Sequence, residues 1–181
     1  MKTWLATLAV ALLASAAPAG AADCPAAPDF YQRPLLGDKP VHLCDEFRGR
    51  VLLIVNTASK CAYTPQYEGL EALYARYRER GLVVVGFPSN DFGAQEPGSE
   101  KQVQDFCRLT YGVQFPMFAK TRVRSPDAEP FYQYLANASG DTPRWNFHKY
   151  LLDRQGRVVA GFPSQVEPQD ERLIAAIEAL L

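Results

Sequence analysis

The sequence lacks the residues that several kinds of functional site require. It has only two histidines, His42 and His148, and no two of its four cysteines have the spacing of metal ligands. Basic residues are not in excess, since 19 of them are balanced by 20 acidic residues and the formal net charge is −1. A metal centre is therefore not expected, and no basic field is present to hold nucleic acid or an anionic membrane.

Long apolar runs are also scarce, and the only candidate for a membrane span lies at the start of the chain. Lys2 precedes an apolar stretch over 4–16, and small residues follow through Ala22, with an A-x-A-like site at 19–21. This layout is typical of a secretory signal peptide. An uncleaved anchor is the alternative, but the stretch is short and alanine-rich for a spanning helix. We therefore expect residues 1–22 to direct export and to leave no membrane anchor.

Residues 23–181 are predicted to form a single domain, because they are too few for two ordinary domains and show no repeat. The residue patterns predict strands over 41–47, 51–55, 82–85, 115–119, 147–153 and 157–162. They predict helices over 64–81, 100–111, 130–137 and 167–181. Buried strands that alternate with helices, followed by a hairpin and a last helix, indicate an α/β domain with a thioredoxin-like fold, a central mixed β-sheet flanked by helices.

One cysteine, Cys61, lies where a helix N-terminus can lower the pKa of a thiol. Cys61 lies three residues before Thr64, which is expected to cap the helix over 64–81. A free thiol is only about 3% ionised at pH 7, and lowering its pKa by ~1.5 units requires roughly 2 kcal/mol. A helix N-terminus supplies about 0.3–1 kcal/mol of this. Further hydrogen-bond donors are therefore needed if Cys61 is a reactive nucleophile.

The residues around Cys61 favour a single-thiol nucleophile over a disulfide exchanger. Thr64 occupies the position that a second cysteine holds in a C-x-x-C motif, and a threonine cannot resolve a mixed disulfide. The alternative is that Cys61 is merely a small apolar side chain in a loop.

Four segments carry a family resemblance over about residues 29–181. The stretch 51–70 contains Asn-Thr-Ala-Ser-Lys-Cys61-Ala-Tyr-Thr-Pro, and 86–98 reads Gly-Phe-Pro-Ser-Asn-Asp-Phe-Gly-Ala-Gln-Glu-Pro-Gly. The Trp-Asn-Phe run at 145–147 and the Phe-Pro-Met-Phe run at 115–118 complete the set. Together they resemble the glutathione peroxidase family, in its bacterial, cysteine-type form without selenium.

The resemblance implies a thiol peroxidase that reduces hydrogen peroxide and organic hydroperoxides without a cofactor. It assigns Cys61 as the nucleophile and Gln95, Trp145 and Asn146 as the other catalytic side chains. These three donate hydrogen bonds and do not titrate near neutral pH. Aimed at sulfur they favour the thiolate, and aimed at peroxide oxygen they stabilise the departing oxygen.

The oxidised Cys61 must be reduced again, and the resemblance leaves two routes open. An external thiol such as glutathione can do so, or an internal cysteine can form a disulfide that a thioredoxin-like protein reduces. Ser89 stands where many relatives have a cysteine. Cys107 is therefore the expected resolving cysteine, although its place on a helix face also suits an ordinary buried residue.

The other two cysteines, Cys24 and Cys44, lie outside the four segments and 20 residues apart. Four cysteines can pair in three ways, and the sequence alone does not choose between them. For an exported protein, which we expect in the bacterial periplasm, a structural Cys24–Cys44 disulfide is the simple interpretation. The stretch between Tyr111 and Trp145 is short beside that of the oligomeric members of the family that the chain resembles, which favours a monomer.

Two other functions stay open on the sequence. A thioredoxin-like peroxide sensor would use the same first step at Cys61 and pass the oxidation to a partner without significant turnover. A thiol–disulfide oxidoreductase is the third possibility, and the C-x-x-T motif counts against it.

Overall fold

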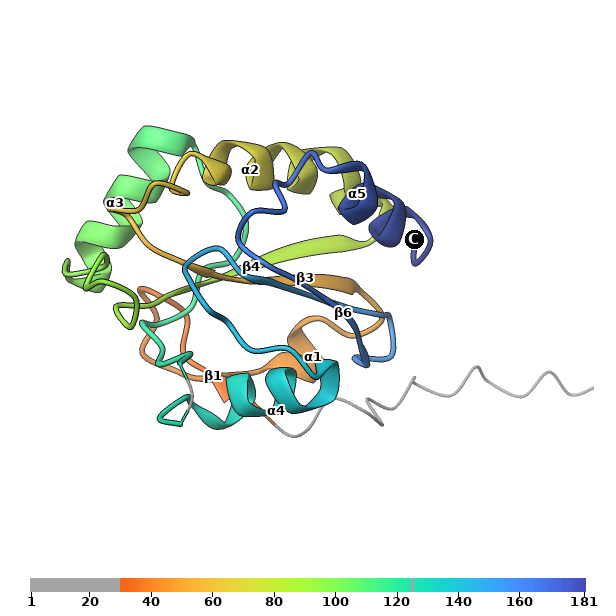
Figure 1. Ribbon diagram of the computed structural model, residues 1–181, viewed down its shortest axis with the longest axis horizontal. Coiled ribbons are helices and arrows are strands. Elements are labelled where there is room, and N and C mark those ends of the chain that lie inside the picture. The colour runs from red at the N-terminus through yellow and green to blue at the C-terminus, as the bar shows by residue number, and fades with distance from the viewer. Residues whose placement is uncertain (1–29, 125) are drawn as a thin grey trace, which may run out of the picture.

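The computed structural model describes residues 30–124 and 126–181. The expected signal peptide and Cys24 lie outside the described residues. The described part has a central sheet with helices on both faces (Figure 1). This confirms the predicted thioredoxin-like architecture of a central mixed sheet flanked by helices.

The main sheet contains four strands in the order β4-β3-β5-β6. These are β3 (Val51–Thr57), β4 (Leu82–Pro88), β5 (Lys149–Leu152) and β6 (Val158–Phe162). β3 and β4 are parallel, whereas β5 is antiparallel to both β3 and β6. A second, two-stranded sheet pairs β1 (Tyr31–Gln32) with β2 (Val41–His42). The predicted hairpin near the C-terminus is thus present as β5 and β6.

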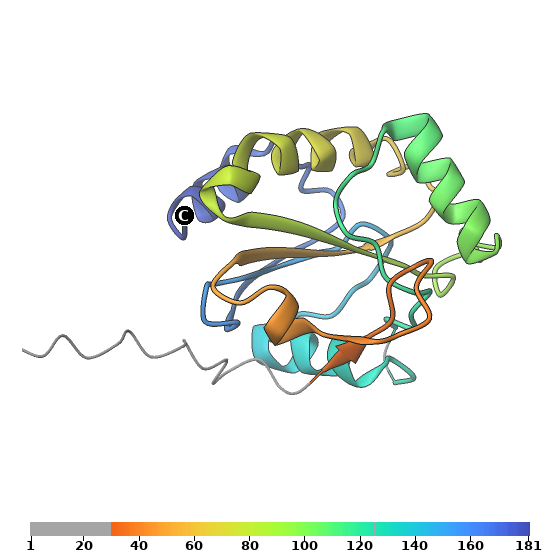
Figure 2. The same ribbon diagram turned by 180° about the vertical axis from the view of Figure 1, so that it is seen from behind.

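The helices form one layer on each face of the main sheet, and the views from the front and from behind agree on this (Figures 1 and 2). One layer contains α2 (Gln66–Tyr77) and α5 (Glu171–Glu178), with α3 (Glu100–Tyr111) at its end. The other contains α1 (Leu43–Glu46) and α4 (Pro130–Ser139). The 3₁₀ turn η1 (Arg78–Arg80) follows α2, and no helix in the described ranges is long and apolar enough to cross a bilayer.

Two apolar cores lie on the two faces of the sheet, which explains why β3 and β4 are buried along their whole length. Leu53 and Val55 of β3 pack with Leu70 in the core beneath α2. Ile54, which points to the opposite face, packs in the core beneath α4. The continuous aliphatic runs in the sequence correctly predicted strands covered on both sides.

Two predicted strands are wrong. In 41–47, only Val41 and His42 form a strand, and the chain then coils into α1 because Leu43 and Phe47, four residues apart, pack in the same core. In 115–119, backbone pairing with the main sheet is limited to one isolated bridge, between Gly86 and Met117. Pro116 has no N–H to continue a ladder there.

Helix ends were predicted with mixed success. The capping box at α3 is confirmed, since the Ser99 side chain accepts from the Gln102 N–H and the Gln102 side chain accepts from the Ser99 N–H. The last helix begins at Glu171 behind an Asp170 cap, later than the predicted 167. α2 begins at Gln66, and the Thr64 side chain does not cap it.

Candidate active site

Cys61 lies in the loop between β3 and α2, at the carboxyl end of a central strand. The Thr64 hydroxyl accepts the Cys61 N–H at 2.9 Å and donates to the Ala58 carbonyl at 2.9 Å. The Cys61 carbonyl accepts the Thr64 N–H at 3.0 Å, which starts a run of turns that leads into α2. Thr64 therefore fixes the cysteine loop instead of capping the helix, which corrects the role expected for it.

Cys61 is largely buried, with 9% of the residue exposed. Within the described ranges, the hydrogen bond found at its sulfur comes from the Tyr63 backbone N–H, at 3.4 Å. The start of α2 also lies close by, five residues further along the chain.

Gln95 and Asn146 meet beside this loop, although they are 51 residues apart in the chain. The Asn146 Nδ2 atom donates to Gln95 Oε1 at 3.0 Å. The backbone carbonyl of Gln95 accepts the Lys60 N–H at 3.1 Å, directly before Cys61. The fold thus brings together the three segments that carry the predicted nucleophile, glutamine and asparagine.

The backbone before Gln95 takes an uncommon path to reach this place. Gly93 has φ +63° and Ala94 has φ +49°, so two successive residues lie in the left-handed region. A residue with a side chain is rarely found there, and such strain is common at functional sites. The turn presents Gln95 to the cysteine loop.

Trp145 and Asn146 sit on a turn that Asn56 holds from the end of β3. Asn56 Nδ2 donates to the Trp145 carbonyl at 3.1 Å, and the Asn56 carbonyl accepts the Phe147 N–H at 2.6 Å. Trp145 is 39% exposed, and its ring lies 5.8 Å from that of Phe92. The Oδ1 atom of Asn146 is buried and has no partner in the described protein, which leaves an acceptor open for an O–H or S–H donor.

A buried carboxylate, Glu96, also adjoins the cysteine loop. The Ser59 hydroxyl donates to its Oε2 atom at 3.1 Å, and burial raises the pKa of this carboxyl. A hollow of about 410 Å³ opens at this place. It is lined by Ser59, Lys60, Glu96, Pro97, Gly98, Gln102, Val103 and Phe106.

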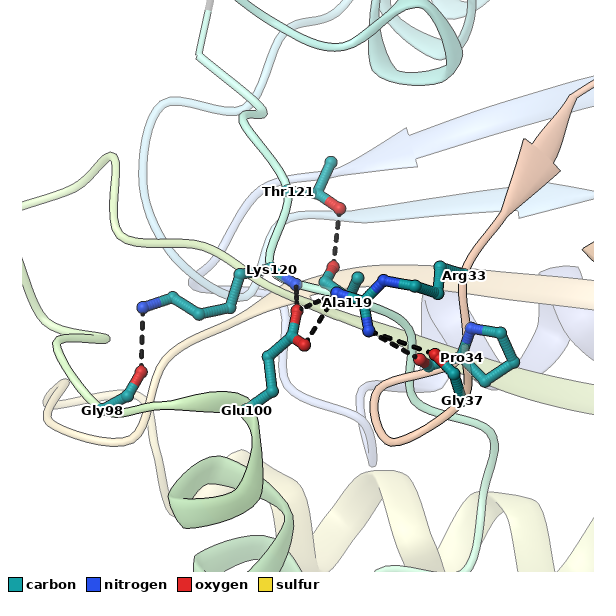
Figure 3. A network of polar contacts seen from close by, with 8 residues as sticks. All are labelled: Arg33, Pro34, Gly37, Gly98, Glu100, Ala119, Lys120 and Thr121. Carbon is teal, nitrogen blue, oxygen red and sulfur yellow. Dashed lines mark hydrogen bonds and ion pairs between the residues drawn. The ribbon is translucent and has the colours of Figure 1, made fainter. Parts of the chain in front are cut away.

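A polar network fixes the segment that follows Gln95 (Figure 3). Lys120 Nζ donates to the carbonyls of Glu96 and Gly98 at 2.6 and 3.0 Å. Glu100, the first residue of α3, accepts the Lys120 N–H at 3.0 Å and receives both hydrogen bonds of Arg33 Nη2, at 2.6 and 2.7 Å. Together these contacts, which we call the Lys120 network, immobilise the start of α3.

Cys107 lies on α3 and is 1% exposed, inside the core that also contains Cys61. Both thiols are free. Burial raises the pKa of the Cys107 thiol to about 11, and the charge of Glu96 adds to this, whereas a hydrogen bond with Tyr67 opposes it. In this state Cys107 is a core residue, so α3 must loosen before this thiol can react.

The sequence analysis did not single out three buried polar residues near the site: Asn56, Glu96 and Lys149. Asn56 lies within an otherwise apolar strand and Lys149 begins one, and a polar residue in that position is the signal that could have identified them. Glu96 had no such signal, because it stands in a polar loop. In the described ranges no three side chains of metal-binding type are grouped as a metal site.

Comparisons with known proteins agree on what the chain resembles. The family model described as glutathione peroxidase matches residues 29–136. "Hydroperoxy fatty acid reductase gpx1" of Synechocystis sp. is 47% identical over 156 residues, which cover 81% of this chain and 90% of the relative. "Glutathione peroxidase-like peroxiredoxin gpx1" of Schizosaccharomyces pombe is 46% identical over 138 residues, 74% of this chain and 86% of the relative.

Solved structures show the same similarity in three dimensions. The crystal structure of T. cruzi GPX1 has a TM-score of 0.64 and 29% identity, and the match covers 82% of this chain and 94% of that one. A thioredoxin-family thiol:disulfide interchange protein from Chlorobium tepidum TLS matches with a TM-score of 0.63 at 15% identity, over 86% of this chain and 94% of that one. The second likeness concerns the fold alone.

Proposed function

Because this chain belongs to the glutathione peroxidase family, we propose that it is a thiol peroxidase in which Cys61 attacks the peroxide. The observation that carries the proposal is the meeting of Gln95 and Asn146 beside the cysteine loop, through the Asn146–Gln95 bond of 3.0 Å and the Lys60–Gln95 bond of 3.1 Å. These contacts bring two side-chain amides, from segments distant in the sequence, to the loop that contains Cys61.

The reaction begins with the thiolate of Cys61. Its sulfur bonds to one oxygen of the hydroperoxide while the O–O bond breaks, so sulfur is oxidised to a sulfenic acid and the peroxide is reduced. The departing hydroxide or alkoxide takes up a proton and leaves as water or alcohol. The amides of Gln95 and Asn146 and the indole N–H of Trp145 are the proposed donors to the departing oxygen. Trp145 is exposed enough to meet a substrate that enters from solvent.

Hydrogen peroxide and organic hydroperoxides are the proposed substrates. Fatty acid hydroperoxides are included because two Synechocystis relatives, 47% and 49% identical, are named hydroperoxy fatty acid reductases. The partly exposed Trp145 ring, which packs against the buried Phe92, gives the rim of the site an apolar surface that suits an alkyl chain.

The regeneration step is proposed to run through Cys107. Its thiolate attacks the sulfenic sulfur of Cys61, a disulfide forms and water is released. A thioredoxin-like protein then reduces the disulfide by two electrons. Support comes from relatives named glutathione peroxidase-like peroxiredoxins. Glutathione is the alternative reductant, and it would act directly on the Cys61 sulfenic acid.

We also propose that the protein is exported to the bacterial periplasm as a monomer and that a Cys24–Cys44 disulfide ties its N-terminal segment. The layout of residues 1–22 supports the export. Cys44 is already engaged in an interaction, since it is not among the free thiols of the described part.

A peroxide sensor is the second candidate, and the burial of Cys107 favours it. If α3 rarely opens, the oxidised Cys61 persists and can transfer its oxidation to a partner protein. Turnover separates the two functions, because a sensor needs only one oxidation event whereas a peroxidase consumes many equivalents of peroxide.

The test is peroxide consumption with two reducing systems, thioredoxin with its reductase and glutathione with its reductase. The wild-type protein is expected to turn over with thioredoxin, Cys61→Ser is expected to be inactive, and Cys107→Ser is expected to lose the thioredoxin-dependent activity. Mass mapping after one equivalent of peroxide is expected to show a Cys61–Cys107 disulfide. Full activity in Cys61→Ser would refute the nucleophile, whereas a Cys61 glutathione adduct without the disulfide would refute only the role of Cys107.

A further inference from the structure

Lys149 is a buried lysine to which the proposed chemistry gives no role. It is 0% exposed, and lysine is among the residues least often buried completely. It lies on β5 opposite Val55 of β3, and directly opposed residues of an antiparallel pair point to the same face. Because Val55 packs in the core beneath α2, the Lys149 side chain also lies on that side of the sheet.

The Lys149 amine joins two segments of the site. Nζ donates to Gln66 Oε1 at 2.7 Å and to the Phe147 carbonyl at 2.7 Å. Gln66 is the first residue of α2, five positions after Cys61, and its own Nε2 atom donates to the Ser164 carbonyl at 2.7 Å. The buried amine therefore ties the start of the helix behind the nucleophile to the turn that carries the other catalytic side chains.

That turn needs to be held in place. Phe147 has φ +66°, which a bulky residue adopts only when its surroundings enforce it. Three contacts do so: the N–H bond to Asn56 at 2.6 Å, the carbonyl bond from Lys149 and the edge-on ring contact with Tyr67 at 5.3 Å. The conformation at Phe147 determines where the preceding residue, Asn146, points.

We propose that Lys149 is a positioning residue, which holds the turn with Trp145 and Asn146 against the start of α2 and so aligns Asn146 with Gln95. The inference rests on the proposed peroxidase function, because it assigns Lys149 an effect on the step that breaks the O–O bond. Lys149 acts through Asn146 and does not itself touch the substrate.

The two hydrogen bonds that Lys149 donates do not depend on the charge of its amine. Burial lowers the pKa of Lys149 to about 7, while the negative charge of Glu167, on the loop before α5, opposes that shift. The other titratable neighbours are uncharged near pH 7, because burial lowers the pKa of His148, directly before β5, to about 4 and raises that of Tyr67 on α2. Both partners of Nζ are oxygen acceptors, and a neutral amine still has two N–H groups to donate to them.

The test is a double-mutant cycle between Lys149→Met and Asn146→Ala in the full chain. Stopped-flow measurement gives the second-order rate constant for the reaction of Cys61 with hydrogen peroxide. Lys149→Met is expected to lower this constant about tenfold, the size of effect that a small misplacement of a catalytic group produces. In the Asn146→Ala background, Lys149→Met is expected to cause no further loss, since the residue through which it acts is already absent.

A second readout separates positioning from general damage to the fold. Alkylation of Cys61 by iodoacetamide needs the thiolate but no aligned donor for a departing oxygen, so its rate is expected to be unchanged in Lys149→Met. The matched control is His148→Gln, which alters a buried polar residue directly before the same strand and is expected to leave the peroxide rate constant unchanged. The His148 ring contacts Tyr150, in the core on the opposite face of the sheet.

The inference is overturned if Lys149→Met lowers peroxide and iodoacetamide rates equally, or if its loss is the same with and without Asn146. If Lys149→Met does not fold, Gln66→Leu removes one of the two acceptors, and the same cycle with Asn146→Ala decides the matter. The proposed function fails separately, and recognisably, if the wild-type protein itself does not react with peroxide at Cys61.

Discussion

Gly112 offers a way to speed the release of Cys107 without altering any group of the active site. It ends α3 in the left-handed conformation, with φ +63°, and its N–H bonds to the carbonyls of Arg108 and Cys107. A Cβ atom added at Gly112 would meet nothing within 4 Å. Gly112→Ala therefore strains the backbone at the end of α3 and disturbs no packing.

The size of the effect follows from this geometry. A left-handed alanine costs roughly 1–2 kcal/mol, and the smaller conformational freedom of alanine in the opened chain returns about 0.4–1 kcal/mol. The net change of about 1 kcal/mol raises the population with an opened α3 end about fivefold. Opening also frees the Cys107 thiol from the burial that raises its pKa to about 11. If the pKa of the released thiol returns to ~8.5, the fraction of Cys107 that is ionised at pH 7.5 rises about 300-fold.

The assay follows the two steps of a single turnover. After one equivalent of peroxide, samples are quenched at increasing times and alkylated, and the Cys61 sulfenic acid and the Cys61–Cys107 disulfide are measured by mass spectrometry. Gly112→Ala is expected to form the sulfenic acid at the wild-type rate and the disulfide about fivefold faster, because only the second step needs an open α3.

Gly140→Ala is the matched control for this experiment. Gly140 ends α4 with φ +69°, and an added Cβ would again meet nothing within 4 Å, so the backbone strain is the same but lies away from Cys107. Its disulfide step is expected to stay at the wild-type rate. Equal acceleration in both variants, or none in Gly112→Ala, would refute the claim that the opening of α3 limits resolution.

Two further predictions concern stability. Burial lowers the folded-state pKa of His148 to about 4, with Asp141 at 3.8 Å opposing the shift, so the unfolded chain binds more protons and stability falls as the pH drops from about 6.5 to 4. Urea titrations at pH 7 and 4.5 should show that His148→Gln loses less of its free energy of unfolding on acidification than the wild type does, by up to about 3 kcal/mol. An equal loss in the variant and the wild type would contradict this. Cys44→Ser should lower the free energy of unfolding by about 3 kcal/mol if a Cys24–Cys44 disulfide closes its 20-residue loop. Dithiothreitol should then lower the free energy of unfolding of the wild type by the same amount and leave that of the variant unchanged.

The parts of the fold that local chemistry determines were predictable from the sequence. The capping box of Ser99 and Gln102 involves residues three apart, so both the start of α3 and its bonds could be stated in advance. The buried runs in β3 and β4 were equally clear, because strands covered on both faces leave no polar alternation.

The parts that depend on the path of a loop were predicted less well. Thr64 carries every sign of a helix cap, yet its hydroxyl bonds to Ala58 and Cys61 because the cysteine loop folds back on it. The segment 115–119 has strand-like residues but pairs with the main sheet only through one isolated bridge. In both cases the residue types suit the predicted element, and the path of the backbone decides otherwise.

The proposed catalytic set comes from the family resemblance, and its geometry was not predictable from local pattern. The bond between Asn146 and Gln95 joins loops 51 residues apart. The supporting residues Asn56 and Lys149 escaped notice because nothing in the local sequence reveals that a buried polar side chain will find a partner. The one sequence signal that points to them is that each is a polar residue in an otherwise apolar strand.

The Lys120 network separates the part of α3 beside Gln95 from the part that contains Cys107. It fixes the first turn of α3, where Glu100 holds Arg33 and the backbone of Lys120, whereas Cys107 and Gly112 lie toward the other end of the helix. Unwinding from that end would release Cys107, the proposed resolving thiol, while Gln95 stays in place. Mutations near Gly112 could therefore adapt the pace of each catalytic cycle to a different supply of reductant, with the chemistry at Cys61 inherited intact.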